Sequence, residues 1–221
     1  MEDEIRKILY KTFSLTALDP ETFKSFKSGG VDYQVEWYQV KGIGNLCYVE
    51  TRAKLGLIRS RTLVFQGLDR DMPLLKITWE KNGHNRFYTF EEINTMNRPD
   101  LFNKDAFQTA HFALHNCPDA PMKPHWYDSL YLVPPCHKSA GAKDDDQFLS
   151  ALYLVVRSYL DLSKIMPTLS AVDIGKKKEV VRKVNDGLIS GTNECFDKFK
   201  EALGEDKATL FYQKVYLGYR R

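Results

Sequence analysis

Glu50 is the residue whose surroundings most clearly suggest chemistry. It lies in a β-rich run, where strict alternation places Leu46, Tyr48, Glu50 and Arg52 on one face of a strand. A carboxylic acid on a covered sheet face is a plausible proton donor, because desolvation favours its protonated form. The alternative is an ion pair with Arg52 or Arg61 across the strands. The sequence leaves these two interpretations of Glu50 open.

Arg59 and Arg61 alternate on the next β-rich run and therefore share one face of their strand. Guanidinium groups bind carboxylates in a planar, two-pronged geometry. A ligand with propionate arms would suit this pair if their face meets a pocket. The alternative is an ordinary solvated sheet face.

His125 and Trp126 lie in the segment Pro124-His125-Trp126-Tyr127-Asp128, which reads as a rigid loop ahead of an apolar run. An imidazole in such a loop can relay protons near neutral pH. The indole can stack on a flat ligand. Ordinary packing of the loop explains the same residues.

Three consecutive aspartates, Asp144, Asp145 and Asp146, precede a long apolar-periodic segment. Carboxylates at a helix start bind free N–H groups and suit the helix dipole, so a cap is the simplest interpretation. Asp145 or Asp146 is also a candidate proton donor. His111 and His115 stand at i and i+4, but no third ligand accompanies them, so we expect no metal site.

Composition excludes several classes of protein. The net charge of +3 is too small for a typical nucleic-acid binder. The sequence contains no GxSxG, HExxH, P-loop or GxGxxG motif. Its four cysteines lack CxxC spacing and are expected to be reduced thiols. The charged N-terminus and the absence of an apolar run of about 18 residues predict a cytoplasmic protein that binds no membrane.

Short β-rich runs bounded by turn residues fill the first half of the chain. Residues 41–45 and 81–85 look like hairpin turns, so the runs form an antiparallel meander. The predicted strands are Val31–Val40, Leu46–Ala53, Leu57–Gln66, Leu74–Lys81 and Arg86–Phe90.

Helices are expected at both ends of the chain. The spacing of apolar residues predicts helices over residues 3–17, 104–114, 144–166, 170–203 with a weak point at Gly187–Gly191, and after Gly204. Residues 116–142 hold five of the nine prolines and read as an ordered loop. Strands grouped first and helices last predict a single α+β domain over residues 1–221. We expect a three-layer α/β/α sandwich, with the N-terminal helix on one face of the sheet and the C-terminal helices on the other.

The order of these features resembles the ferredoxin-dependent bilin reductase superfamily, which includes red chlorophyll catabolite reductases. Four segments, taken in order, carry the resemblance from about Gly44 to Gly218. They are Val49-Glu50-Thr51-Arg52, the stretch LVFQGLDRDMPLL from Leu63, the segment from Pro124-His125-Trp126 through Leu130-Tyr131-Leu132-Val133, and the closing pattern from Asn193 through Gly204 to Leu217.

The resemblance implies that a linear tetrapyrrole binds between the sheet and the C-terminal helices. It also implies reduced ferredoxin as electron donor, a radical mechanism and no tightly bound metal or flavin. Glu50 stands at the family's acidic position, and Asp145 or Asp146 lies near a proton donor of some members. Thr62 and Thr78 stand where the best-known members carry His and Asp.

The function expected from the resemblance is ferredoxin-dependent reduction of a biliverdin-like bilin in the cytoplasm or plastid stroma. The expected site comprises Glu50, Asp145, Asp146 and His125 as proton-transfer groups, and Arg59, Arg61, Thr62, Thr78 and Trp126 around the substrate. Loss of the His and Asp positions favours a second reading, a non-catalytic tetrapyrrole carrier. A third is a protein-binding module whose run Lys176-Lys177-Lys178 meets an acidic partner.

Overall fold

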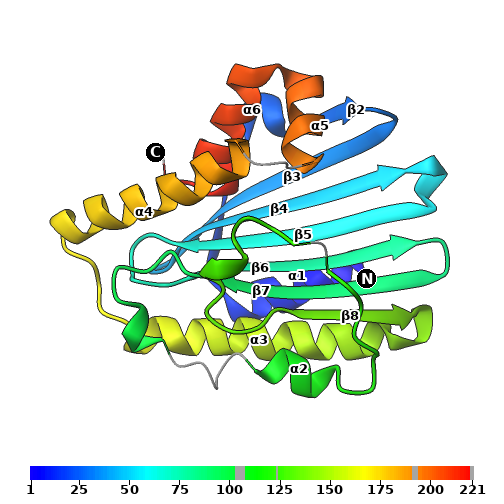
Figure 1. The fold of residues 1–221 in the computed structure, drawn as a ribbon, viewed down its shortest axis with the longest axis horizontal. Coiled ribbons are helices and arrows are strands. Elements are labelled where there is room, and N and C mark those ends of the chain that lie inside the picture. Colours follow the sequence, from blue (N-terminus) through cyan, green and yellow to red (C-terminus); the bar gives the residue numbers. More distant parts are fainter. Residues whose placement is uncertain (103–107, 123, 191–193, 220–221) are drawn as a thin grey trace.

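The fold is built around an eight-stranded antiparallel sheet (Figure 1). The computed structural model describes residues 1–102, 108–122, 124–190 and 194–219. Seven strands follow the order β1-β3-β4-β5-β6-β7-β8, and β2 also pairs with β3. The strands are β1 (Leu15–Leu18), β2 (Ser25–Ser28), β3 (Val31–Val40), β4 (Gly44–Ala53), β5 (Ile58–Gly67), β6 (Leu74–Asn82), β7 (Asn85–Ile93) and β8 (Cys136–Gly141).

Helices lie on both faces of this sheet, which confirms the predicted α+β fold with a central antiparallel sheet. They are α1 (Glu2–Thr12), α2 (Thr109–Ala113), α3 (Asp145–Ile165), α4 (Ala171–Ser190), α5 (Glu194–Leu203) and α6 (Glu205–Phe211). One turn of π-helix, Tyr212–Tyr216, continues α6. None of the helices in the described ranges is long and apolar enough to cross a bilayer.

One face of the sheet, called the α3 face below, packs against α1, α2 and α3. Its core joins Ile5 and Leu9 of α1 with Phe148 and Tyr159 of α3 over inward residues such as Phe65 of β5. The prediction that the N-terminal helix and the C-terminal helices cover opposite faces is therefore wrong for α3. Apolar residues on two sides of the sheet require both layers, and alternation alone does not say which helix fills which layer.

The opposite face, called the α6 face below, is covered by α4, α5, α6 and the π-helix. Val181 of α4, Phe199 of α5 and Phe211 of α6 pack over Tyr33 of β3 and Val64 of β5. A connection of five residues, 166–170, joins α3 on one face to α4 on the other. Arg70, in the turn between β5 and β6, fixes this connection through a hydrogen bond from its guanidinium to the carbonyl of Met166.

Two predicted elements need correction, and two further helix boundaries fall partly outside the described residues. Residues 15–17 belong to β1, which pairs with the edge of β3, and not to the first helix. The expected loop 116–142 contains β8, an edge strand that pairs with β7. The helix expected over 104–114 is short within the described residues, where α2 spans Thr109–Ala113, and its predicted start at Lys104 lies outside them. In place of the single helix expected over 170–203, α4 ends at Ser190 and α5 begins at Glu194, and residues 191–193 lie outside the described ranges.

Candidate functional site

Glu50 lies on the α3 face, where it is almost completely buried. The alternation predicted for Leu46, Tyr48 and Glu50 is present, since the two apolar residues belong to the core under α1 and α3. Glu50 Oε1 accepts a hydrogen bond of 2.9 Å from Arg61, its partner on β5. Arg52 contributes a second bond of 3.1 Å to the same oxygen. The structural alternative for Glu50, an ion pair with both arginines, is therefore formed.

Arg61 continues this network toward α1 and across the sheet. Its guanidinium lies 3.6 Å from Glu2 of α1 and stacks on the ring of Trp79, 4.8 Å from the centroid. Arg59 lies opposite Arg52 in the register, on the same α3 face. Arg59 and Arg61 are thus together as predicted, but on the side of the sheet that α1 and α3 cover.

Asp145 also belongs to the α3 face. Its Oδ1 accepts hydrogen bonds from the Trp79 indole at 2.9 Å and from the Tyr88 hydroxyl at 3.1 Å. These bonds fix the first turn of α3 to β6 and β7. Burial, followed by the charge of Asp145, raises the pKa of Tyr88 and keeps its hydroxyl protonated. Asp146 is exposed beside it on the helix surface.

Thr62 and Thr78 lie on the opposite, α6 face. They face each other across β5 and β6, with their hydroxyl oxygens 3.3 Å apart. The same cross-strand line continues to Thr89 on β7 and His137 on β8. Thr89 Oγ1 lies 2.8 Å from His137 Nδ1. We call Thr62, Thr78, Thr89 and His137 the hydroxyl row; each of them is only partly buried.

Two titratable residues, His137 within this row and Glu80 beside it, were missed by the sequence prediction. His137 lies in β8, which the prolines of its segment disguised as a loop. Glu80 lies two residues after Thr78 on β6, so alternation could have placed it on the same face. Burial raises the pKa of Glu80, opposed by the charge of Lys198 on α5. Burial lowers the pKa of His137, opposed by Glu91.

A proline-rich segment crosses the strands on this side, and we call its residues 116–122 and 124–135 the strap (Figure 1). Its first part is fixed to β8 by hydrogen bonds between Ala120 N and His137 O and between Ser139 N and Pro118 O. Its second part is fixed to the end of β7 by Asn94 N, which donates to Leu130 O. The strap therefore covers part of the α6 face near the hydroxyl row.

His125 and Trp126 lie in the middle of the strap. The imidazole of His125 is exposed and stacks on Tyr127, with ring centroids 4.9 Å apart. Trp126 rests against Gly187 of α4, where a β-carbon would lie only 2.4 Å from the indole. The strap thus reaches from the β8 edge to the helical layer, with aromatic rings along it.

An ion pair fixes the strap to the sheet. Lys76 Nζ on β6 lies 2.7 Å from Glu91 on β7, and the Tyr131 hydroxyl donates a 2.7 Å bond to Glu91. Burial alone would lower the pKa of Lys76, but Glu91 raises it well above its usual value. Burial likewise acts to raise the pKa of Glu91, and Lys76 outweighs it and lowers that pKa. Lys76 and Glu91 are therefore both charged, and each is the ion-pair partner of the other.

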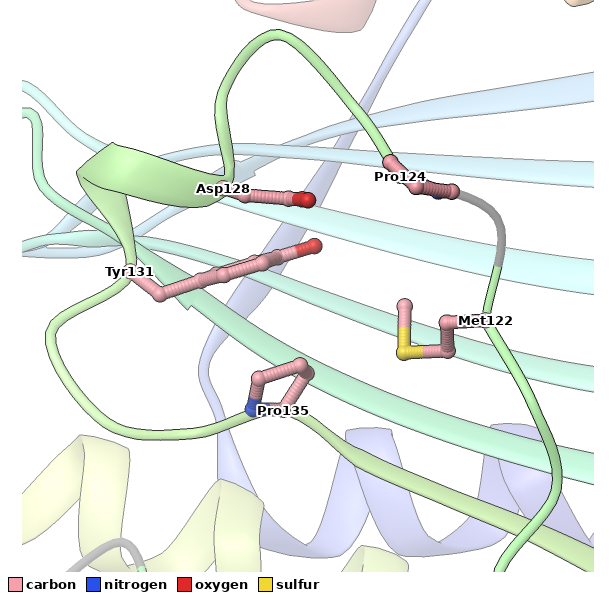
Figure 2. Close-up of a pocket in the computed structure, with 5 residues that line it drawn as sticks. All are labelled: Met122, Pro124, Asp128, Tyr131 and Pro135. Atoms are coloured by element: carbon pink, nitrogen blue, oxygen red, sulfur yellow. The ribbon is translucent and has the colours of Figure 1, made fainter.

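A shallow pocket of about 290 Å³ opens between the two arms of the strap (Figure 2). Met122 and Pro124 line one side of it, and Asp128, Tyr131 and Pro135 line the other. Asp128 and Tyr131 point their oxygen atoms into the space in Figure 2. The walls combine apolar side chains with a few polar atoms, which is typical of small-molecule sites, although the volume is at the small end.

No group of three metal-ligating side chains occurs among the residues that the structure describes. His111 Nε2 instead lies 3.1 Å from the carbonyl of Pro134, and His115 Nδ1 lies 2.8 Å from that of Phe112. Lys177 of the predicted basic run is completely buried, where its ammonium binds the carbonyls of Met72 and Thr95 and lies 3.6 Å from Asp71. Lys177 therefore anchors α4 and offers no surface charge.

Comparison with known proteins identifies the architecture. No family model and no curated protein matches the sequence. Among solved structures, phytochromobilin synthase from tomato in complex with biliverdin aligns with 99% of this chain and 83% of its own, at a TM-score of 0.77 and 14% identity. The chain has the fold of that synthase. The resemblance to the bilin reductase superfamily predicted from the sequence is confirmed at the level of the fold.

The structure divides the predicted site residues between the two faces of this fold. Glu50, Arg59, Arg61 and Asp145 lie on the α3 face, and Asp146 lies on the surface of α3. Thr62, Thr78, His125 and Trp126 lie on the α6 face or on the strap above it. One ligand cannot contact both groups, because the sheet separates them. The catalytic and binding roles themselves stay predictions.

Proposed function

We propose that this protein binds a linear tetrapyrrole on the α6 face, over the hydroxyl row and beneath the strap and the C-terminal helices. The observation that carries the proposal is the fold shared along 99% of the chain with a synthase whose structure holds biliverdin. The partly buried hydroxyls of Thr62 and Thr78 supply hydrogen-bonding groups on that face. The α3 face is a poor alternative, because Glu50 and Arg61 there are buried and bound to each other.

The strap supplies the remaining features of a tetrapyrrole site. His125, Trp126 and Tyr127 provide aromatic surfaces, which favour flat conjugated ligands.

A cation lies on the same side of the sheet. Burial raises the pKa of the Glu80 carboxyl, and the charge of Lys198 on α5 opposes this shift. A cation in that position suits a propionate arm better than Arg59 and Arg61, which lie on the far face.

The reaction that we propose is reduction of the bound bilin by single electrons from reduced ferredoxin, coupled to protons from the protein. It is tested by reconstitution of the purified chain with biliverdin, ferredoxin and a ferredoxin reductase. We expect the long-wavelength absorption band of biliverdin to decay and a reduced bilin to appear. An unchanged spectrum across several linear tetrapyrroles would contradict the reductase assignment.

Non-catalytic binding of the same ligand is the second candidate function. It is favoured by the threonines at positions 62 and 78, because a hydroxyl is a far weaker acid than the Asp or His that the family resemblance leads one to expect there. Tight biliverdin binding without turnover in the reconstituted system would support it. Loss of turnover in a variant that still binds biliverdin would contradict it.

A further inference from the structure

We propose that Glu80 and His137 are the proton-exchanging residues of the tetrapyrrole site, in place of Thr62 and Thr78. This inference rests on the proposed function. It follows from the charged groups that β5 to β8 place on the α6 face. Lys76 and Glu91 are bound to each other at 2.7 Å. Glu80 and His137 have no ion-pair partner among the described residues.

His137 has the geometry of a relay residue. Its Nδ1 is fixed by Thr89 at 2.8 Å, and its ring stacks on Phe87 with an interplanar angle of 11°. Its Nε2 has no hydrogen-bond partner in the part of the chain that the structure describes. A hydrogen bond that fixes one ring nitrogen determines the role of the other, so the free Nε2 is the atom offered to a ligand.

Glu80 lies beside the same row, two residues beyond Thr78 along β6 and opposite Phe87 of β7. It is half-buried and faces Ser60 on β5 and the charge of Lys198 from α5. Burial favours its neutral, proton-carrying form, which is the form a proton donor needs. Neighbouring strands are about 4.8 Å apart, so His137 lies roughly 10 Å across the sheet from Thr78. Protons therefore reach the ligand at two separated points.

The stoichiometry of the reaction needs two such groups. Reduction of one double bond takes two electrons and two protons. The electrons come singly from two reduced iron–sulfur proteins of the ferredoxin class, each of which is oxidised. One proton leaves the Glu80 carboxyl, and the other leaves Nε2 of the His137 ring, which relays it from water. Both residues regain their protons from water, since both are partly exposed.

The test uses the absorption spectrum of bound biliverdin as a function of pH, a readout that does not require turnover. Protonation of a pyrrolic nitrogen changes the long-wavelength band of a linear tetrapyrrole. The other charged groups that face this site are the same residues in every variant compared, so they do not account for differences between the variants. They are Lys76 of β6, Glu91 of β7, His125 and Asp128 of the strap, and Lys198 of α5.

We expect the wild-type complex to show a pH-dependent spectral transition to which both groups contribute, Glu80 with a pKa raised by burial and His137 with a pKa lowered by burial. Glu80→Gln and His137→Gln each remove part of that transition from the spectrum of the bound biliverdin. Thr89→Val shifts the transition without removing it, since it alters only the Nδ1 contact. His84→Gln, in the exposed β6–β7 hairpin, is the matched control and titrates like wild type.

The outcomes separate this inference from the proposed function. If wild type binds biliverdin and both glutamine variants titrate as wild type does, Glu80 and His137 do not exchange protons with the ligand. A wild-type complex whose biliverdin spectrum does not change with pH would lead to the same conclusion. If addition of the wild-type protein does not alter the spectrum of biliverdin at any pH, biliverdin is not bound and the proposed function itself is wrong. Unfolding of a glutamine variant is detected by circular dichroism, and Thr89→Val then decides the role of His137.

Discussion

Glu50 and Thr62 occupy adjacent strands, yet they lie on opposite faces of the sheet. Glu50 is paired with Arg61, and the partner of Thr62 on β4 is Val49. The offset of one residue is decisive, because successive side chains of a strand alternate between faces. An acid at position 50 therefore cannot share a ligand with hydroxyls at 62 and 78.

Glu50 is expected to be a stability residue. Glu50→Gln removes one partner of a buried charge pair, which leaves Arg61 with the more distant carboxylate of Glu2, 3.6 Å away. Loss of one partner of such a pair costs about 3–5 kcal/mol in the free energy of unfolding. Urea unfolding measures this cost, with the exposed Asp146→Asn as control at less than about 0.5 kcal/mol. A Glu50→Gln protein as stable as wild type would contradict the structural role.

Asp145 is expected to stabilise the start of α3. Asp145→Ala leaves the Trp79 indole and the Tyr88 hydroxyl without their acceptor. Each unpaired buried donor costs about 1–3 kcal/mol. Asp145→Asn keeps one acceptor oxygen and should cost clearly less, which denaturant unfolding of both variants checks. Equal effects of the two substitutions would mean that the hydrogen bonds are unimportant.

Glu92 gives the stability of the protein a dependence on pH. It is buried on the α3 face, and burial, with a smaller contribution from Glu91, raises its pKa to about 8. Its pKa in the unfolded chain is near 4.5, so between pH 4.5 and 8 the native state holds a proton that the unfolded state has lost. The stability contributed by protonated Glu92 is complete below pH 4.5 and is lost as pH rises to 8, by up to about 1.4 kcal/mol per pH unit.

Glu92→Gln removes this slope, which urea unfolding of both proteins at pH 5 and pH 8 would show. The gap between the variant and wild type should widen in favour of the variant as pH rises. Lys177 affects stability in a separate pH range. Burial lowers its pKa to about 8, so its contribution to the pH dependence of the unfolding free energy begins above that pH. A constant gap between pH 5 and 8 would show that Glu92 is not held protonated.

The contact between Trp126 and Gly187 is expected to hold the strap in place. Gly187→Ala puts a β-carbon 2.4 Å from the indole, so the tryptophan must move away. Gly175→Ala in the same helix meets no atom within 4 Å and is the matched control. An alanine in a helix is better than glycine by about 1 kcal/mol, so the control should be stabilised. We expect only Gly187→Ala to increase tryptophan quenching by acrylamide; equal quenching in both would disprove the contact.

Much of the sheet was predictable from the sequence. The predicted bounds of the strand Val31–Val40 match those of β3. The turns expected at residues 41–45 and 81–85 predicted the antiparallel meander, because turn residues and alternation are local signals. The division of α3 from α4 to α6 was not predictable. It depends on where the chain passes around the ends of the strands between α3 and α4, beside Arg70, which is a tertiary feature without a local signature (Figure 1).

The candidate site was predictable only in part for the same reason. Alternation correctly gave Glu50 a covered face, but it could not tell which face α1 and α3 would fill. His137 was not predicted because its strand is stabilised by pairing with β7, a tertiary feature, and the prolines that precede the strand indicated a loop. Glu80 carried a usable signal, its spacing of two residues from Thr78.

The most direct test of a ligand site on the α6 face is a biliverdin titration of wild type, Thr78→Phe and Glu50→Gln, followed by visible absorption and induced circular dichroism. Thr16→Phe, which adds the same ring to the exposed strand β1, is the control for Thr78→Phe. We predict that wild type, Glu50→Gln and Thr16→Phe bind biliverdin alike, and that Thr78→Phe binds at least about tenfold more weakly, equivalent to about 1.4 kcal/mol. Unchanged binding in Thr78→Phe, with loss of binding in Glu50→Gln, would place the ligand on the α3 face and contradict the account.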